Sequence, residues 1–175
     1  MKINPITKTQ FLHYFKNIEN SNIWQVIHPA DGWLIIDLGI KYTDTVPGRN
    51  GQDQPYERGE YQIFIRGDWK IYKKNKLFAT RQVKNDNQKE YFDRMEQLTN
   101  DFPINKVKKV SLNKGTLIIS GEDAKIKILI DPTTDTISLS KVKLDANKQP
   151  LFYYHYGFAE KINGLAVIEA QAAEN

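Results

Sequence analysis

The stretch YQIFIRGDWKIYKK, residues 61–74, alternates like a β-strand and yet has Arg-Gly-Asp at its centre. Residues two apart in a strand share a face. Five large residues at odd positions keep one parity through the tripeptide, which predicts a single strand through Gly67, or a bulge there, with Trp69 pointing inward. An adhesion tripeptide needs a projecting loop tip, so we interpret Arg-Gly-Asp as structural. The residues that share the parity are Tyr61, Ile63, Ile65, Trp69 and Ile71.

Two helices are predicted outside this stretch, at about residues 8–18 and 86–100. In the first, Phe11, Phe15 and Ile18 recur with helical spacing, and Thr7 or Thr9 could cap its start. In the second, apolar residues recur in the same way before Pro103, and Asp86 or Asn87 could cap its start.

The remaining sequence is dominated by β-strand patterns. GWLIIDLG (residues 32–39) and GTLIISG (residues 115–121) each precede an alternating strand, which hints at a duplication. We therefore predict a single α+β, β-rich domain over residues 1–175, with two similar antiparallel β-meander units packed as a sandwich or open barrel. Residues 43–60 contain three Gly and two Pro, which predicts a long surface loop.

Composition limits the function only broadly. Apolar residues at 40% and charged residues at 26% are ordinary for a globular domain, and the net charge of +4 is mildly basic. The absence of cysteine excludes disulfides, thiolate catalysis and cysteine-based zinc sites. With neither a signal-peptide pattern nor a membrane-spanning apolar run, we expect a cytoplasmic protein without a membrane partner.

No catalytic constellation is evident. His28 and Asp31 could form a catalytic pair, but a turn-stabilising role is favoured, and no nucleophile elbow accompanies them. Metal-ligand spacings and glycine-rich phosphate loops are also missing from the sequence. We therefore expect neither an enzyme nor a bound metal or cofactor.

Lysines and aromatic residues on alternating strands allow a nucleic-acid surface as an alternative. Basic groups could follow the phosphates of a single strand while exposed aromatic rings stack on its bases. Lysines on outer strand faces also serve simply as solvated residues that discourage edge pairing. The residues of this alternative are Lys70, Tyr72, Lys73, Lys125 and Lys127.

Residues 32–140 resemble small bacterial immunity proteins of polymorphic toxin systems, particularly the WapI-like family. The resemblance rests on WLIIDLG, GEYQIFIRGDWKI and VKKVSLNKGTLIISGEDAKIKILID in that order, with a helix between the second and third. The family pattern is similar, with G-E-x-x-I-x-I-x-x-x-W-R-I followed by V-x-x-V-x-x-x-x-G-x-L-x-I-x-F. This chain has Lys70 in place of the family Arg and lacks the closing Trp-Arg.

The resemblance implies an immunity protein that binds a cognate bacterial toxin and occludes its active site. We expect the 43–60 segment to make the contact, because loops vary without damage to a fold. A basic inhibitor suits an acidic toxin surface. A nucleic-acid-binding β-module and a barrel holding a small apolar ligand remain as alternatives. The expected contact residues are Arg49, Asp53, Tyr56 and Arg58.

Overall fold

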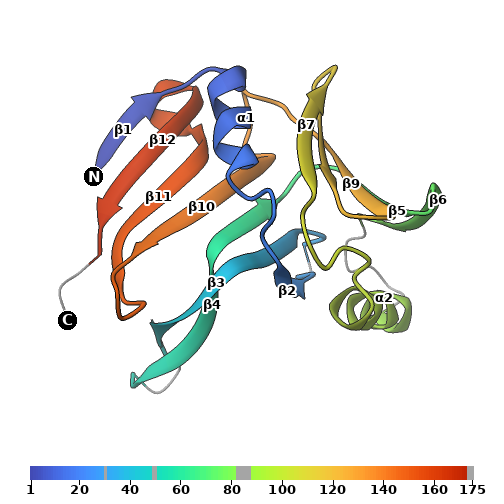
Figure 1. Cartoon of the computed structure of the whole chain (residues 1–175), viewed down its shortest axis with the longest axis horizontal. Helices are drawn as coiled ribbons and strands as arrows, with labels where there is room; N and C mark the ends of the chain where they lie inside the picture. Colours follow the sequence, from blue (N-terminus) through green and yellow to red (C-terminus); the bar gives the residue numbers. More distant parts are fainter. Residues whose placement is uncertain (30, 49–50, 82–87, 173–175) are drawn as a thin grey trace.

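The computed structural model describes residues 1–29, 31–48, 51–81 and 88–172. It forms two antiparallel sheets, of seven and five strands, and two helices (Figure 1), so the predicted β-rich α+β class is confirmed. The helices are α1 (Lys8–Lys16) and α2 (Gln88–Asn100), with a short 3-10 helix at Glu160–Ile162. The strands are β1 (Lys2–Pro5), β2 (Ile23–Ile27), β3 (Leu34–Pro47), β4 (Asp53–Ile65), β5 (Trp69–Lys73), β6 (Lys76–Thr80), β7 (Lys109–Asn113), β8 (Thr116–Ser120), β9 (Ala124–Leu129), β10 (Ile137–Leu144), β11 (Pro150–Ala159) and β12 (Gly164–Gln171).

The strand order shows an internal repeat of topology. The seven-stranded sheet runs β1-β12-β11-β10-β4-β3-β2, and the five-stranded sheet runs β6-β5-β9-β8-β7. Strands β2–β6, which follow α1, correspond in chain order to strands β7–β11, which follow α2. When each strand in the order β11-β10-β4-β3-β2 is replaced by its counterpart, the result is β6-β5-β9-β8-β7, the order of the five-stranded sheet. Each half is therefore a helix, a three-stranded meander in one sheet and a hairpin in the other. The predicted pair of similar meander units is confirmed at this level.

The two halves of the chain meet just before the first strand of each meander. Asn22, just before β2, forms an antiparallel bridge with Lys106, just before β7. The Ile23 amide donates to the Asn105 carbonyl (2.8 Å), and the Val107 amide donates to the Ser21 carbonyl (3.0 Å). These reciprocal bonds join the two sheets at one end of the molecule.

The Arg-Gly-Asp tripeptide is the crossover between the sheets. β4 ends at Ile65 in the seven-stranded sheet and β5 starts at Trp69 in the five-stranded sheet, so the prediction of one strand through Gly67 is wrong. Trp69 does point inward, with 1% of its surface exposed. The amides of Arg66 and Gly67 both donate to the Thr136 carbonyl in the second crossover, at 2.8 Å. The odd-numbered residues on both sides of the tripeptide do point inward, but the chain passes from one sheet to the other between Ile65 and Trp69.

One core cluster joins both sheets and α1. Its largest fully buried side chains include Trp69, Phe11 and Phe15. Thr7 caps α1 in a capping box with Gln10, which selects between the two predicted caps. The residues predicted to cap α2, Asp86 and Asn87, lie outside the described residues. The sheets remain open, so the described residues do not form the closed barrel that the apolar-ligand alternative requires.

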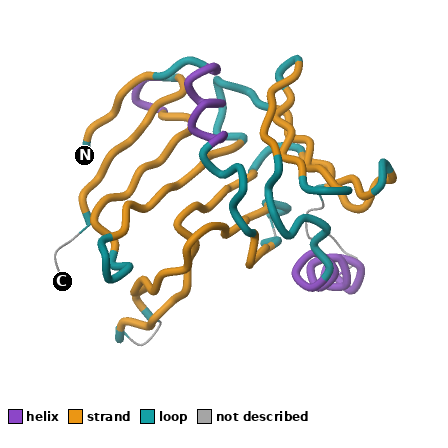
Figure 2. The backbone as a smooth tube through the Cα atoms, in the orientation of Figure 1, coloured by secondary structure: helices purple, strands orange, loops and turns teal. Residues whose placement is uncertain are grey.

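Residues 43–60 are mostly strand, and the prediction of a long surface loop is wrong. β3 continues to Pro47 and β4 starts at Asp53, and the two pair along this whole length. Figure 2 shows the resulting two-stranded extension below the rest of the seven-stranded sheet. Alternating β-branched residues such as Thr43 and Thr45 favour a strand, and Gly51, with a φ of 76°, serves the turn.

Candidate partner-binding ribbon

The paired residues 41–47 of β3 and 53–59 of β4 form a ribbon that outreaches its neighbours. β10 pairs with β4 only from Ile65 to Tyr61, and β2 pairs with β3 only as far as Leu38. β3 and β4 continue to pair with each other as far as Pro47 and Asp53. The ribbon therefore projects beyond the rest of the seven-stranded sheet.

The ribbon has one inward and one outward face. On the inward face Tyr42 is buried, and Asp44, Tyr56 and Arg58 are half-buried. On the outward face Thr43, Thr45, Asp53, Pro55 and Glu57 are exposed. The outward face is thus open to solvent, while the inward face packs toward the sheet.

A polar network under the ribbon holds it in place. The Arg58 guanidinium donates to Gln62 Oε1 (2.7 Å) and lies 3.4 Å from Asp44 Oδ2. The Tyr153 hydroxyl of β11 also donates to Asp44 Oδ2, at 3.3 Å. Because Tyr153 lies two strands away from β4 in the sheet, this bond shows that the ribbon bends over the sheet face.

Asp37 is the buried centre of this network. Its Oδ1 accepts from the Gly59 amide and from Gln62 Nε2, both at 3.0 Å. Burial raises the pKa of the Asp37 carboxyl, and the hydrogen bonds and the Arg58 charge only partly oppose that rise. Asp37 Oδ2 and the Tyr42 hydroxyl are buried without a hydrogen-bond partner among the described residues.

A cavity of about 140 Å³ lies beside this network, on the same face of the sheet. Small and apolar residues of β10 and β12, such as Val142 and Ala170, line one part of it. Burial lowers the pKa of His155, which favours its neutral form. The other lining residues are Tyr42, Arg58, Gly59, Gln62, Ser140, Tyr153, Tyr154, His155 and Ile168.

The predicted contact residues are divided between the two faces. Asp53 lies on the exposed face, whereas Tyr56 and Arg58 turn toward the sheet. Arg49 lies outside the described residues. Sequence reasoning missed Asp37, although one signal was present, because it is the one charged residue inside the apolar run WLIIDLG. It also missed Tyr153, whose contact depends on the bend of the ribbon.

The lysine and tyrosine residues of the nucleic-acid alternative mostly come together. Lys70 lies opposite Lys127, and Tyr72 lies opposite Lys125, so these four share the outer face of the five-stranded sheet. Lys127 Nζ lies 5.1 Å from the centre of the Tyr72 ring. Lys73 has the opposite parity, since it pairs with the buried Ala124.

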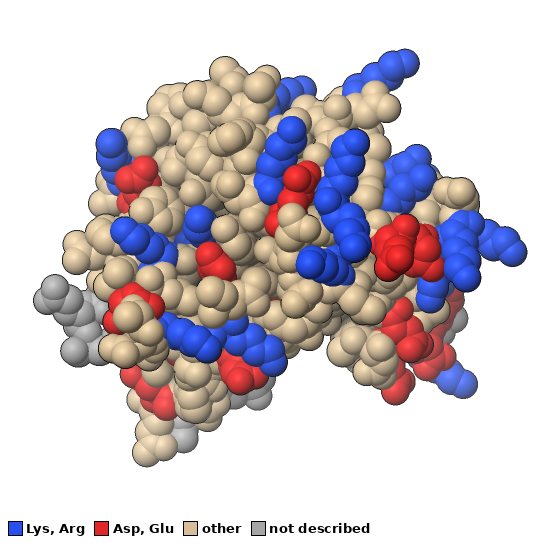
Figure 3. Space-filling view, viewed as in Figure 1, with Lys and Arg blue, Asp and Glu red and all other residues tan. Residues whose placement is uncertain are grey.

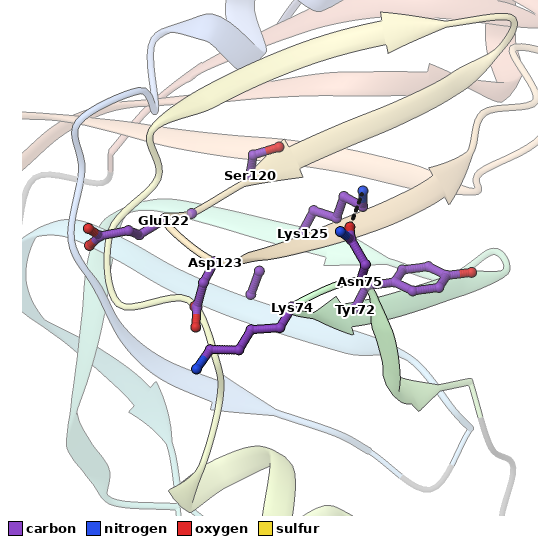
Figure 4. A pocket seen from close by; sticks show the side chains of 9 residues that line it. Tyr72, Lys74, Asn75, Ser120, Glu122, Asp123 and Lys125 are labelled. Carbon is purple, nitrogen blue, oxygen red and sulfur yellow. Dashed lines mark hydrogen bonds between the residues drawn. The ribbon is translucent and has the colours of Figure 1, made fainter.

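A shallow pocket of about 300 Å³ lies at one end of this face. Figure 4 shows Tyr72, Asn75 and Lys125 close together there, with a hydrogen bond of 3.4 Å from Lys125 Nζ to Asn75 Oδ1. Glu122 and Asp123 from the β8–β9 turn also line the pocket. Its mixed charge suits a strongly anionic ligand poorly.

Charges of both signs also mix on the face drawn in Figure 3, where acidic side chains lie among the lysine and arginine side chains over both sheets. A surface dedicated to a phosphate backbone would be more uniformly basic. The face drawn in Figure 3 is thus not uniformly basic.

His28 and Asp31 do not form the catalytic pair considered from sequence. His28 is fully buried between the rings of Trp69 and Tyr91, and neither ring nitrogen has a partner among the described residues. Burial lowers the pKa of His28, which favours the neutral ring. Across the described ranges, no cluster of three or more metal-ligating side chains was found.

None of the described helices is long and apolar enough to cross a membrane. Comparisons with protein-family models, with curated protein sequences and with solved structures found no match.

Proposed function

We propose that the protein binds a cognate bacterial toxin in the cytoplasm and neutralises it by occluding its active site with the ribbon. The observation that supports this proposal is the projection of paired strands beyond Tyr61 and Leu38, fixed on one face by Arg58 and exposed on the other. A preorganised element of this kind loses little conformational entropy when it binds. The family resemblance supplies the identity of the partner as a toxin.

The net charge of the protein and the local charges of the ribbon have different consequences for the partner. The net charge of +4 attracts an acidic toxin over long range. The described ribbon itself has charges of both signs, with Lys41 and Arg58 against Asp44, Asp53 and Glu57. We therefore expect local specificity to come from individual contacts and the overall attraction to come from the rest of the protein.

The test is co-expression with the toxin gene that neighbours the gene for this protein. The wild type should rescue growth and co-purify with the toxin. The variant Asp53→Lys with Glu57→Lys changes two exposed ribbon carboxylates and should lose both effects. The control Glu122→Lys with Asp123→Lys makes the same charge change at the β8–β9 turn and should retain them. Absence of rescue by the wild type, or equal rescue by both variants, would refute the proposal.

A nucleic-acid-binding module is the second candidate, because Lys70, Tyr72, Lys125 and Lys127 share one sheet face. This function would give an affinity for single-stranded oligonucleotides that falls steeply with salt. Lys125→Glu with Lys127→Glu should then abolish binding, and Lys141→Glu with Lys143→Glu on the other sheet should not. No binding at low salt would eliminate this candidate.

A further inference from the structure

Three outer strands of the described sheets, β7, β6 and β1, have protected edges. On β7, the Val110 amide donates to Glu19 Oε1 at 2.7 Å. On β6, Arg94 of α2 donates to the Phe78 carbonyl at 3.1 Å. β1 has four residues and ends at Pro5. Covering, shortening and proline are the usual protections of an edge against pairing with another chain.

The outer edge of β3 in the ribbon is open. Pro55 has no amide hydrogen, so the Thr45–Pro55 pair cannot be a pair that exchanges two hydrogen bonds. Hydrogen-bonded and non-hydrogen-bonded pairs alternate along an antiparallel ladder, so the pairs made by Thr43 and Lys41 are also non-hydrogen-bonded. Lys41, Thr43 and Thr45 therefore turn their backbone polar groups away from β4. Beyond Leu38, β2 no longer covers this side.

The other strand of the ribbon is protected, because Pro55 lies on its outer edge and offers no donor. On β3 the Thr45 amide donates to Asp44 Oδ1 at 2.9 Å. No described residue of another element accepts a hydrogen bond from the amides of Lys41 or Thr43. Ile40 and Val46 at the two ends of this edge are 49% and 37% exposed. The edge is thus polar in its backbone and apolar at both ends.

We propose that this edge pairs with the same edge of a second copy of the chain, antiparallel, with Thr43 on the two-fold axis. In this register Thr43 lies opposite Thr43, and Lys41 lies opposite Thr45 of the second copy. Ile40 then lies opposite Val46 of the second copy, at both ends of the paired segment. A two-fold interface needs such a self-complementary surface.

Two of the neighbouring registers are disfavoured by charge. An axis at Lys41 places two lysines opposite each other, and an axis at Asp44 places two aspartates opposite each other. Directly opposed like charges destabilise an antiparallel pair. The axis at Thr43 avoids both clashes and pairs the two exposed apolar residues.

The dimer should be weak and concentration-dependent. A seven-residue edge buries less than the roughly 800 Å² per partner of a standard stable interface. The pairing itself uses backbone groups of β3, so the inference does not depend on the proposed toxin.

The experiment uses the lack of cysteine in the natural chain. In this register the two Thr43 Cα atoms lie about 5.5 Å apart, within the range for a disulfide. The two Thr45 Cα atoms are offset by four residues, or about 13 Å, beyond reach of one. Under mild oxidation Thr43→Cys should form covalent dimers about tenfold faster than the matched control Thr45→Cys.

Sedimentation of the unmodified protein over a concentration series provides the second measurement, since it needs no cysteine. Association at high concentration together with selective cross-linking of Thr43→Cys supports the inference. Equal or faster cross-linking of Thr45→Cys overturns the register. A monomer at every concentration, without selective cross-linking, overturns self-pairing and leaves the edge to a strand of another protein.

Discussion

The indole N–H of Trp69 donates a 3.0 Å hydrogen bond to the backbone carbonyl of Gly32. Trp69 starts β5 in one sheet, and Gly32 lies just before β3 in the other. In the second half, the amide of Ile130, just after β9, donates to the carbonyl of Gly115 at 2.9 Å. Gly32 and Gly115, with φ values of 75° and 79°, occupy matching positions of the repeat. Each crossover is thus hydrogen-bonded to the first turn within a meander, between β2 and β3 or between β7 and β8.

Replacing Trp69 with Phe should destabilise the fold. The substitution removes the bond to Gly32 and leaves a buried carbonyl unpaired, which should cost about 2 kcal/mol. Urea unfolding measures the change. Trp24→Phe is the matched control, because the Trp24 indole N–H is already buried without a partner among the described residues. The control should cost little, and a larger loss for it than for Trp69→Phe would contradict this account.

Asp37 should make stability depend on pH. Burial raises its pKa above the ordinary value near 3.8, so the folded protein holds a proton that the unfolded chain releases. This group therefore contributes most at low pH, and its contribution falls as pH rises from about 3.8 through the folded pKa.

Asp37→Asn should remove that dependence, because the amide does not titrate. Urea unfolding between pH 4 and pH 8 measures the free energy of unfolding. It should fall less steeply with pH in Asp37→Asn than in the wild type, and the slopes should differ by up to the equivalent of about one bound proton. Asp53→Asn changes an exposed carboxylate outside the network and serves as control. An unchanged slope in Asp37→Asn would show that the carboxyl does not titrate abnormally.

Arg58 should fix the ribbon on the sheet, whereas Glu57 should not. Arg58→Ala removes the charged bond to Gln62 and the partly exposed pair with Asp44, a loss of about 2 kcal/mol. Hydrogen exchange of ribbon amides should also accelerate. Glu57→Ala breaks an exposed 3.8 Å pair with Lys41 and should cost at most about 0.5 kcal/mol. Equal effects would mean that the inward network does not hold the ribbon.

Gly59 should not tolerate a side chain. A Cβ at this position would lie 2.6 Å from the Leu38 amide nitrogen, and backbone cannot move away as a flexible side chain would. Gly59→Ala should cost about 3 kcal/mol or shift the base of the ribbon. At Gly115 a Cβ meets nothing within 4 Å, so Gly115→Ala should cost about 1 kcal/mol from its φ of 79° alone. Thermal unfolding of both variants ranks them, and the reverse order would contradict this packing.

The candidate site was less predictable than the fold. The lysine and tyrosine face could be predicted because Lys70, Tyr72, Lys125 and Lys127 follow strand parity, which is local. The ribbon was mistaken for a loop because Gly and Pro are abundant in it, and Pro55 is tolerated only because its pair needs no amide donor. That condition depends on the partner strand, which local composition does not specify.

By itself the sequence determined the two helices, the inward position of Trp69 and the two similar meanders, because helical and strand periodicities act between near neighbours in the chain. Only the tertiary structure decided that Arg66-Gly67-Asp68 crosses between sheets, that Asp37 and Tyr153 support a ribbon, and that the β3 edge stays open. These features arise from contacts between residues far apart in sequence, and such contacts form only when the whole chain has packed.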